Sequence, residues 1–198
     1  MVQTTNYIKH KKSTKNPINN FFVKNFNKAM VKEVKKLRPQ SVLDVGCGEG
    51  FTLSMLKQNK IGKHLEGIDN MDDAIKLGHE LHPTLTIKKG NIYKLPYNDN
   101  TFDLVICSEV LEHLEFPSRA VKELVRVSKK FVVLSVPNEP WFTVQRFLRG
   151  KNILELGDHP EHIQHWSSGK FKKFLGQFVV IKSIKTPLPW TLVSARKI

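Results

Sequence analysis

The chain has 198 residues, of which 40% are hydrophobic and 25% are charged, as in an ordinary globular domain. This composition excludes collagen-like, mucin-like and wholly disordered proteins, and no apolar run approaches the roughly 20 residues that a membrane span requires. The basic N-terminus has no continuous apolar stretch behind it, so no secretory signal is expected. Two cysteines, Cys47 and Cys107, cannot build a disulfide framework, and we therefore expect a reducing, cytoplasmic setting.

The charge is strongly basic and unevenly distributed. The 32 Lys and Arg residues against 18 Asp and Glu residues give a net charge of +14. Residues 1–40 carry a net charge of +9 and residues 168–198 a net charge of +7, whereas residues 41–167 carry −2. Only six of the basic residues are Arg, so a Lys-rich solvated surface is the simpler interpretation. The alternative is a basic collar near the site of an anionic substrate, such as a phosphate, a lipid headgroup or RNA.

Hydrophobic periodicity predicts alternating helices and strands. Residues 1–16 are polar and Lys-rich, and we expect them to form a mobile basic segment. Apolar residues at helical spacing from Phe22 to Leu37 predict a helix that Pro39 ends. The pattern then predicts strands at 41–46, 64–69, 85–88, 102–107 and 131–136, separated by helices near 51–57, 70–81 and 120–125. This alternation predicts an α/β fold, a Rossmann-like three-layer sandwich around a mainly parallel sheet.

The C-terminal third departs from this alternation. Residues 138–166 contain Pro, Gly, three His and two Trp, and are interpreted as a lid-like insertion. A short helix near 170–175 and two strands at 179–185 and 190–195 follow. The connection between these strands is too short for a crossover helix, so they predict an antiparallel hairpin that completes a seven-stranded sheet. We expect residues 17–198 to form a single domain.

The turn after the first predicted strand is rich in glycine and reads Asp44-Val-Gly46-Cys-Gly48-Glu-Gly50. Glycines let the backbone bend tightly and let a ligand approach closely, and the next helix presents its N-terminus. A dinucleotide fingerprint would place a third glycine where this chain has Phe51. Carboxylates at Asp44 and Glu49 would repel a pyrophosphate but attract a cationic ligand. Asp69, at the end of the second strand, can accept hydrogen bonds from both hydroxyls of a ribose.

These residues resemble the cofactor motifs of class I S-adenosylmethionine-dependent methyltransferases, in the type 11 group that acts on small molecules. The resemblance implies that the Asp44-x-Gly46-x-Gly48-x-Gly50 loop holds the methionine part of S-adenosylmethionine and that Asp69 binds its ribose. The segment Gly90-Asn91-Ile92, followed by Leu95-Pro96, resembles the adenine-binding motif. Asn91 stands where Asp is usual, and its amide oxygen can still accept from the adenine amino group. The expected cofactor contacts also include Asn70, Ile92 and Ser108.

The segment after the fourth strand carries the candidate catalytic residues and reads Cys107-Ser-Glu109-Val-Leu-Glu112-His113-Leu. It is not the Asn/Asp-Pro-Pro-Tyr/Phe signature of amino-group methylation. If the segment is helical, Glu109, Glu112 and His113 lie on one face and can hold a divalent metal such as Mg²⁺. This pattern resembles the metal site of plant-type small-RNA 2′-O-methyltransferases, and the ubiquinone-biosynthesis O-methyltransferases carry a similar segment.

In the RNA enzymes a further His completes the metal site. Here His162 is the best match, with His159 or His165 as substitutes. A metal held in this way would lower the pKa of a substrate hydroxyl. The alternative needs no metal: the two glutamates complement a helix dipole, His113 fills space under the sheet, and His162 or His165 acts as general base.

Three functions follow from this interpretation. The leading one is methylation of an oxygen on a small molecule, lipid precursor or glycan. The second is 2′-O-methylation of RNA, against which the scarcity of Arg counts. The third is a non-catalytic module that binds S-adenosylmethionine, against which the acids and histidines after the fourth strand count.

Overall fold

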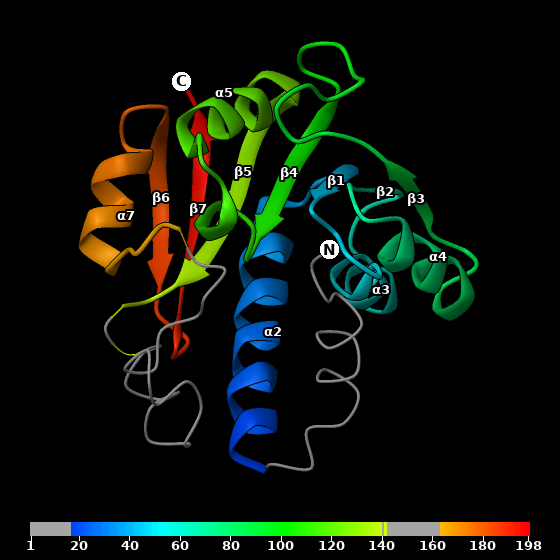
Figure 1. Cartoon of the computed structure of the whole chain (residues 1–198), viewed down its shortest axis with the longest axis horizontal. Coiled ribbons are helices and arrows are strands. Elements are labelled where there is room, and N and C mark those ends of the chain that lie inside the picture. Colours follow the sequence, from blue (N-terminus) through cyan, green and yellow to red (C-terminus); the bar gives the residue numbers. More distant parts are fainter. Residues whose placement is uncertain (1–16, 140, 142–162) are drawn as a thin grey trace.

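A computed structural model describes residues 17–139, 141 and 163–198. Within these residues one seven-stranded sheet has the order β3-β2-β1-β4-β5-β7-β6 (Figure 1). Its strands are β1 (Ser41–Val45), β2 (His64–Asp69), β3 (Thr86–Lys89), β4 (Phe102–Ser108), β5 (Ser128–Pro137), β6 (Val179–Lys185) and β7 (Trp190–Lys197). The predicted Rossmann-like fold is confirmed, with each predicted strand present to within a few residues.

Five of the described helices lie where the sequence predicts them, and a short 3-10 helix lies in the segment after β4. The described helices are α2 (Pro17–Leu37), α3 (Phe51–Gln58), α4 (Asp72–Leu81), the 3-10 helix η1 (Leu111–His113), α5 (Pro117–Val127) and α7 (Ser168–Leu175). None of them is both long and apolar enough to cross a membrane. The mobile segment predicted at residues 1–16 and most of the insertion predicted at 138–166 lie outside the described residues.

The strand pairing places a candidate ligand site at one edge of the sheet. Strands β1 to β5 pair in parallel, whereas β7 runs antiparallel between β5 and β6, which confirms the predicted C-terminal hairpin. The chain order reverses at β1, whose two neighbours are β2 and β4. In open α/β sheets, ligands bind beyond the carboxyl ends of the strands at this switch point.

The central strand β4 shows how helices cover both faces of the sheet. Leu104 and Ile106 pack against Met30 of α2 and Leu56 of α3. The intervening Val105 belongs to a second cluster, which α5 and α7 complete with buried residues that include Val121, Leu124 and Phe171. Successive strand residues point to opposite faces, and all three β4 residues are buried. A continuous apolar run in β4 is therefore required by two covered faces.

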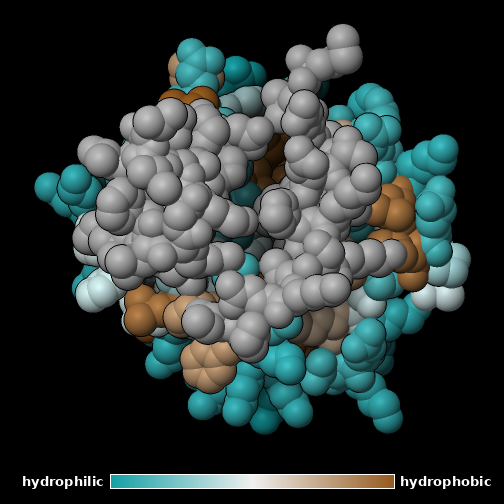
Figure 2. Space-filling model, turned by 60° about the horizontal axis from the view of Figure 1, so that its bottom comes forward, coloured by the Kyte–Doolittle hydropathy of each residue, from teal (hydrophilic) through white to brown (hydrophobic). Residues whose placement is uncertain are grey.

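Helix α2 extends beyond the carboxyl edge of the sheet. The ring of Phe26 lies 5.1 Å from that of Trp190, and Trp190 pairs with Pro137, the last residue of β5. The turns of α2 before Phe26 therefore project past the strand ends, as Figure 1 shows at the bottom of the molecule. Phe21, on these turns, is exposed. Figure 2 is turned toward this end, and its coloured residues are mostly hydrophilic with a few hydrophobic patches.

Candidate active site

The glycine loop after β1 combines close packing with open space. Gly46, Gly48 and Gly50 all have positive φ angles, of 74°, 54° and 81°. A Cβ atom at Gly46 would lie 2.3 Å from Cγ2 of Val110, so the segment after β4 packs directly on this loop. A Cβ atom at Gly48 would meet no atom of the described residues within 4 Å. The loop therefore has room for a ligand at Gly48 and none at Gly46.

Asp69 ties this loop to the start of α4. One carboxylate oxygen accepts a hydrogen bond from the backbone N–H of Gly48 (2.7 Å) and the other from that of Met71 (3.0 Å). Each oxygen keeps a further lone pair, so the ribose contact expected of Asp69 is chemically compatible with these bonds. Met71 occupies the N-cap position of α4, so Asn70 precedes the helix, and its expected contact with the cofactor stays a prediction.

The segment expected to contact adenine lies beside Asp69. The backbone N–H of Gly90 donates to the carbonyl oxygen of Asp69 (2.9 Å). The side-chain oxygen of Asn91 accepts from the backbone N–H of Tyr93 (2.9 Å), which shapes a tight turn at this point. One lone pair of this oxygen is thus already used, and the roles of Asn91 and Ile92 in binding adenine stay predictions.

Five carboxylates gather where the central strands end. Four of them are buried and Glu109 is half-buried; we call Asp44, Glu49, Asp69, Glu109 and Glu112 the acidic cluster. Burial raises the pKa of the Cys47 thiol, and the charges of Asp44, Asp69 and Glu49 raise it further. Burial likewise raises the pKa of Cys107, with smaller contributions from Asp44, Glu112 and Glu109. Asp44 thus connects the two halves of the cluster, and both thiols are buried and disfavoured as thiolates.

Glu109 is held in a strained conformation beside the glycine loop. Its φ angle of 59° is left-handed, which is uncommon for a residue other than glycine. Its backbone N–H donates to the carbonyl oxygen of Ser135 (3.1 Å), and its Oε1 accepts from the Ser135 hydroxyl (2.9 Å). The Ser135 hydroxyl also lies 2.8 Å from that of Ser108. Strain that neighbouring contacts maintain in this way is characteristic of functional sites.

Glu112 is the most deeply buried member of the acidic cluster, at 1% exposure. Burial raises its pKa well above the usual range, and the nearby charge of Glu109 raises it further. Its Oε2 has no hydrogen-bond partner in the part of the chain that the structure describes. Protonation of Glu112 removes the repulsion between the two side chains, so this pair holds one negative charge more readily than two.

The segment that carries these residues is not an α-helix, so the prediction of one face shared by Glu109, Glu112 and His113 is wrong. Only Leu111–His113 is helical, as a single 3-10 turn, and Glu109 precedes it in a left-handed conformation. A single helix from Glu109 through α5 is also excluded, because Pro117 would then lie in the helix interior, where proline is not tolerated. Pro117 instead begins α5. The side chain of His113 is 37% exposed, with its Nε2 4.0 Å from Oε1 of Glu112, and therefore does not fill space under the sheet.

The chain returns to this site just before α7. The backbone N–H groups of Ile163 and Gln164 donate to the carbonyl oxygen of Glu112, at 2.8 and 3.0 Å. The side chain of Gln164 donates to the carbonyl oxygen of Leu114 (3.2 Å). These bonds dock the stretch that carries His165 onto η1, and the role of His165 as a general base stays a prediction. His159 and His162 lie outside the described residues.

The described residues do not assemble the predicted metal site. Among them, no group of three or more His, Cys, Asp and Glu side chains is arranged to hold a metal ion. Metal binding by Glu109, Glu112, His113 and His162 therefore stays a prediction that rests on sequence.

Ser135 is the site residue that the sequence analysis missed. It lies in β5 within the buried apolar run from Val132 to Val136, and its hydroxyl links Ser108 to Glu109. A lone hydroxyl in such a run is the available signal, because a buried polar group needs a hydrogen-bond partner.

Comparison with known proteins identifies relatives of this chain. A family profile described as a methyltransferase domain matches residues 43–135, from β1 to the position of Ser135. An uncharacterised methyltransferase of Schizosaccharomyces pombe is 39% identical over 111 residues, which cover 50% of this chain and 39% of that protein. The mitochondrial ubiquinone biosynthesis O-methyltransferase of Saccharomyces cerevisiae is 31% identical over 147 residues, which cover 67% of this chain and 46% of that protein.

A solved structure extends the match to almost the whole fold. The magnesium protoporphyrin IX methyltransferase of Synechocystis PCC 6803, solved with bound SAH, superposes with a TM-score of 0.71 at 17% identity. The superposition covers 98% of this chain and 95% of that one. At this identity the likeness shows the fold alone. The chain spans less than half the length of the two curated relatives above.

Proposed function

Because this chain carries the methyltransferase domain of the class I S-adenosylmethionine-dependent family, we propose that it transfers a methyl group to an oxygen of a small molecule, lipid precursor or glycan. The observation that carries this proposal is the acidic cluster around an open glycine loop. Buried carboxylates are costly unless a cation or donor compensates them. S-adenosylmethionine supplies a methyl group on a positively charged sulfur, which is such a compensating charge.

The residues of the glycine loop fit this cofactor. The space over Gly48 would accept the methionine part, with Asp44 and Glu49 offering carboxylates to its positive groups. Asp69, already fixed by two backbone N–H groups, would accept from the ribose hydroxyls. The turn at Asn91 would border the adenine, because Gly90 is bonded to Asp69 at the end of β2. All of these residues come from strand ends and are held before any ligand arrives, which limits the entropy lost on binding.

Glu109 is the candidate proton acceptor. Methyl transfer to a hydroxyl requires loss of the hydroxyl proton, and a carboxylate that is fixed in place can take it. The Ser135 hydroxyl donates to Oε1 of Glu109 and so fixes this carboxylate beside the glycine loop. The neighbouring Glu112, favoured in its protonated form, leaves the negative charge of the pair on Glu109. His113 and His165, which lie on the two segments joined at Glu112, are further candidates for the base.

No step of this proposal passes through a metal. Transfer of a methyl group from a sulfonium needs alignment of the acceptor more than a Lewis acid. The proposal therefore predicts full activity in the presence of EDTA. Activity that EDTA abolishes and Mg²⁺ restores would instead support the metal site predicted from sequence.

The direct test is a transfer assay with radiolabelled S-adenosylmethionine. We would offer separate panels of phenols and hydroxylated isoprenoids, glycans, amines and structured RNA, with the protein free of tag and nucleic acid. Label found in a base-stable ether linkage supports O-methylation, and label found only on nitrogen contradicts it. A protein that binds S-adenosylmethionine yet labels none of these panels would support the non-catalytic module. The strained Glu109 argues against that module, because a binding protein has no use for it.

A further inference from the structure

A basic groove lies at the amino edge of the sheet, opposite the candidate active site. It encloses about 840 Å³ between the end of α2, the connection to β1 and the connection from α3 to β2. Its eleven lining residues include no Asp or Glu, and six of them are cationic: Lys32, Lys35, Lys36, Arg38, Lys60 and Lys63. We call this set the basic groove.

Most of these cations are available to a ligand. All six are exposed, and Lys36 forms an ion pair with Glu33 at 2.6 Å. Among the described residues, the other five have no carboxylate oxygen within ion-pair distance. Unpaired cations that converge on one concavity repel each other and raise the local concentration of anions. The groove therefore has the electrostatic character of a polyanion site.

Two of the cations occupy positions that ordinarily favour glycine. Arg38, just after α2, has a φ angle of 49°, and Lys60, just after α3, has a φ angle of 56°. Glycine is common where a helix ends in this left-handed conformation, because other residues are strained there. The helix dipole explains lysines in the last turn of α2 but does not require long cationic side chains at two strained positions. Conformation alone therefore does not account for the cationic side chains at these two positions.

The groove selects against other anionic partners. Its apolar lining consists of Pro39 and Ile61, both buried, so it offers no side chain that could insert into a bilayer. It contains no aromatic side chain on which an unpaired base could stack, as single-strand binding proteins require. Lys32, Lys35 and Lys36 lie at i, i+3 and i+4 on one helix face, a row that suits successive phosphates.

We propose that the basic groove binds the phosphate backbone of a nucleic-acid duplex, without reading its sequence. Ser41 begins β1 at this edge, and the glycine loop follows the other end of that strand, about 17 Å away. A duplex in the groove is thus remote from the acidic cluster. This inference does not depend on the proposed methyl transfer, because it concerns different residues at the opposite edge of the sheet.

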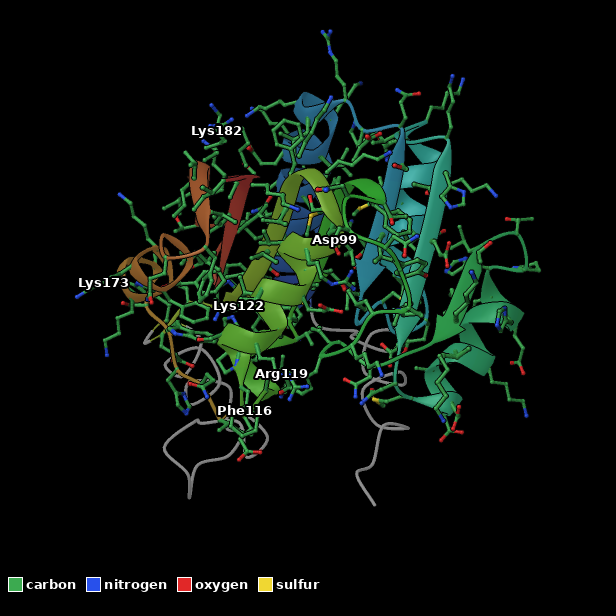
Figure 3. All side chains as sticks on the ribbon, turned by 90° about the horizontal axis from the view of Figure 1, so that it is seen from above. Asp99, Phe116, Arg119, Lys122, Lys173 and Lys182 are labelled. Atoms are coloured by element: carbon green, nitrogen blue, oxygen red, sulfur yellow. The ribbon has the colours of Figure 1, made fainter. Side chains whose placement is uncertain are left out.

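Fluorescence anisotropy with labelled 20-base-pair RNA and DNA duplexes tests the proposal, at 50 and 200 mM NaCl. The groove variant is Lys32→Gln, Lys35→Gln and Lys63→Gln. The matched control is Lys122→Gln, Lys172→Gln and Lys173→Gln, which removes the same charge from α5 and α7 on the other face of the sheet; Lys122 and Lys173 are labelled in Figure 3. We expect the groove variant to lose at least about tenfold in affinity at 50 mM NaCl and the control less than about threefold.

A second variant separates charge from folding. Arg38→Gly with Lys60→Gly removes two cations but relieves strain, so its Tm is expected to equal or exceed that of the wild type while duplex affinity falls. Asn100→Gly, at another left-handed position, is the control without a change of charge. The proposal is supported if the wild-type protein binds either duplex and both groove variants lose affinity for that duplex as described.

Equal losses in the groove variant and its lysine control would overturn the proposal, because they would indicate a general charge effect. Absence of duplex binding at 50 mM NaCl would also overturn it. So would tighter binding of a single strand of the same length, or of phosphatidylserine vesicles, than of either duplex.

Discussion

Carboxylates gather at one edge of the sheet and lysines at the other, and the two groups differ in burial as much as in sign. Asp44, Asp69 and Glu112 are buried, whereas the cations of the basic groove are exposed. A buried charge is costly and persists where a ligand or a reaction compensates it, but an exposed lysine costs little. The net charge of +14 therefore reflects exposed lysines and arginines, whereas the candidate active site is acidic.

The comparison also limits what each edge can do. Contacts at the carboxyl edge are shielded from salt by protein, so cofactor binding there should vary little with ionic strength. Contacts at the amino edge are solvated, so polyanion binding there should weaken steeply as salt rises. The following changes test this division, beginning with the largest expected effect.

Glu109→Gln is expected to lower the rate of methyl transfer by about 10² to 10⁴-fold, the usual contribution of a positioned general base. The amide oxygen can still accept from Ser135, so the fold and SAH affinity should change little. The measurement is kcat at saturating acceptor, with SAH binding by calorimetry as the control. A rate within threefold of the wild type would remove Glu109 from the proton transfer.

Gly46→Ala is expected to destabilise the protein by about 2 to 4 kcal/mol, because the new Cβ would overlap Val110 at a left-handed φ. Gly48→Ala is its matched control: φ is also positive there, but a Cβ atom would meet no atom within 4 Å in the part of the chain that the structure describes. This control should cost only about 1 to 2 kcal/mol of stability, yet weaken cofactor binding by filling the ligand space. Urea unfolding and calorimetry measure both. Similar stabilities for the two variants would contradict the packing described for Val110.

Glu112→Gln is expected to change how stability depends on pH. The raised pKa of Glu112 means that the folded state binds its proton more tightly than the unfolded state does. The contribution of Glu112 to the free energy of unfolding is therefore complete below the pKa that this group has in the unfolded chain. The contribution is lost as the pH rises from that value toward the pKa in the folded protein, by at most about 1.4 kcal/mol per pH unit. The Tm of the variant relative to the wild type should rise from pH 5 to pH 8. A difference that is constant over this range would contradict the assigned direction.

Deletion of residues 1–16 is expected to have the smallest effect on cofactor binding, below about twofold, because the acidic cluster and glycine loop come from β1, β2 and β4. The deletion should alter, at most, capture of an anionic acceptor. Calorimetry with SAH checks this, and a protein that no longer binds SAH would show that the N-terminal segment belongs to the cofactor site.

Periodicity was sufficient to predict the fold because β1, β4 and β5 are buried on both faces, so most of their residues are apolar. The glycine loop and Asp69 were also predictable, since each follows a strand whose end is marked by a change in polarity. The conformation of Glu109 was not predictable. Helical spacing within Glu109-x-x-Glu112-His113 suggested a helix, but contacts with Ser135 impose a left-handed turn that spacing cannot reveal.

The basic groove could not be predicted from the sequence, for a different reason. Regional counting assigned the basic charge to the two ends of the chain, and a region that includes Lys60 and Lys63 was counted as slightly acidic. The fold brings these lysines beside the end of α2, so the groove joins two stretches whose charges cannot be added along the sequence.

Calorimetric titration with S-adenosylmethionine tests the central claim, that the acidic cluster and glycine loop hold this cofactor. The account predicts 1:1 binding that Asp69→Asn weakens at least about tenfold, since it would lose charge-assisted bonds to the ribose. The control is Asp72→Asn, three residues after Asp69, which removes an exposed carboxylate that pairs with Lys89. This variant should leave the affinity for S-adenosylmethionine unchanged. No binding of S-adenosylmethionine together with tight binding of NAD would contradict the account.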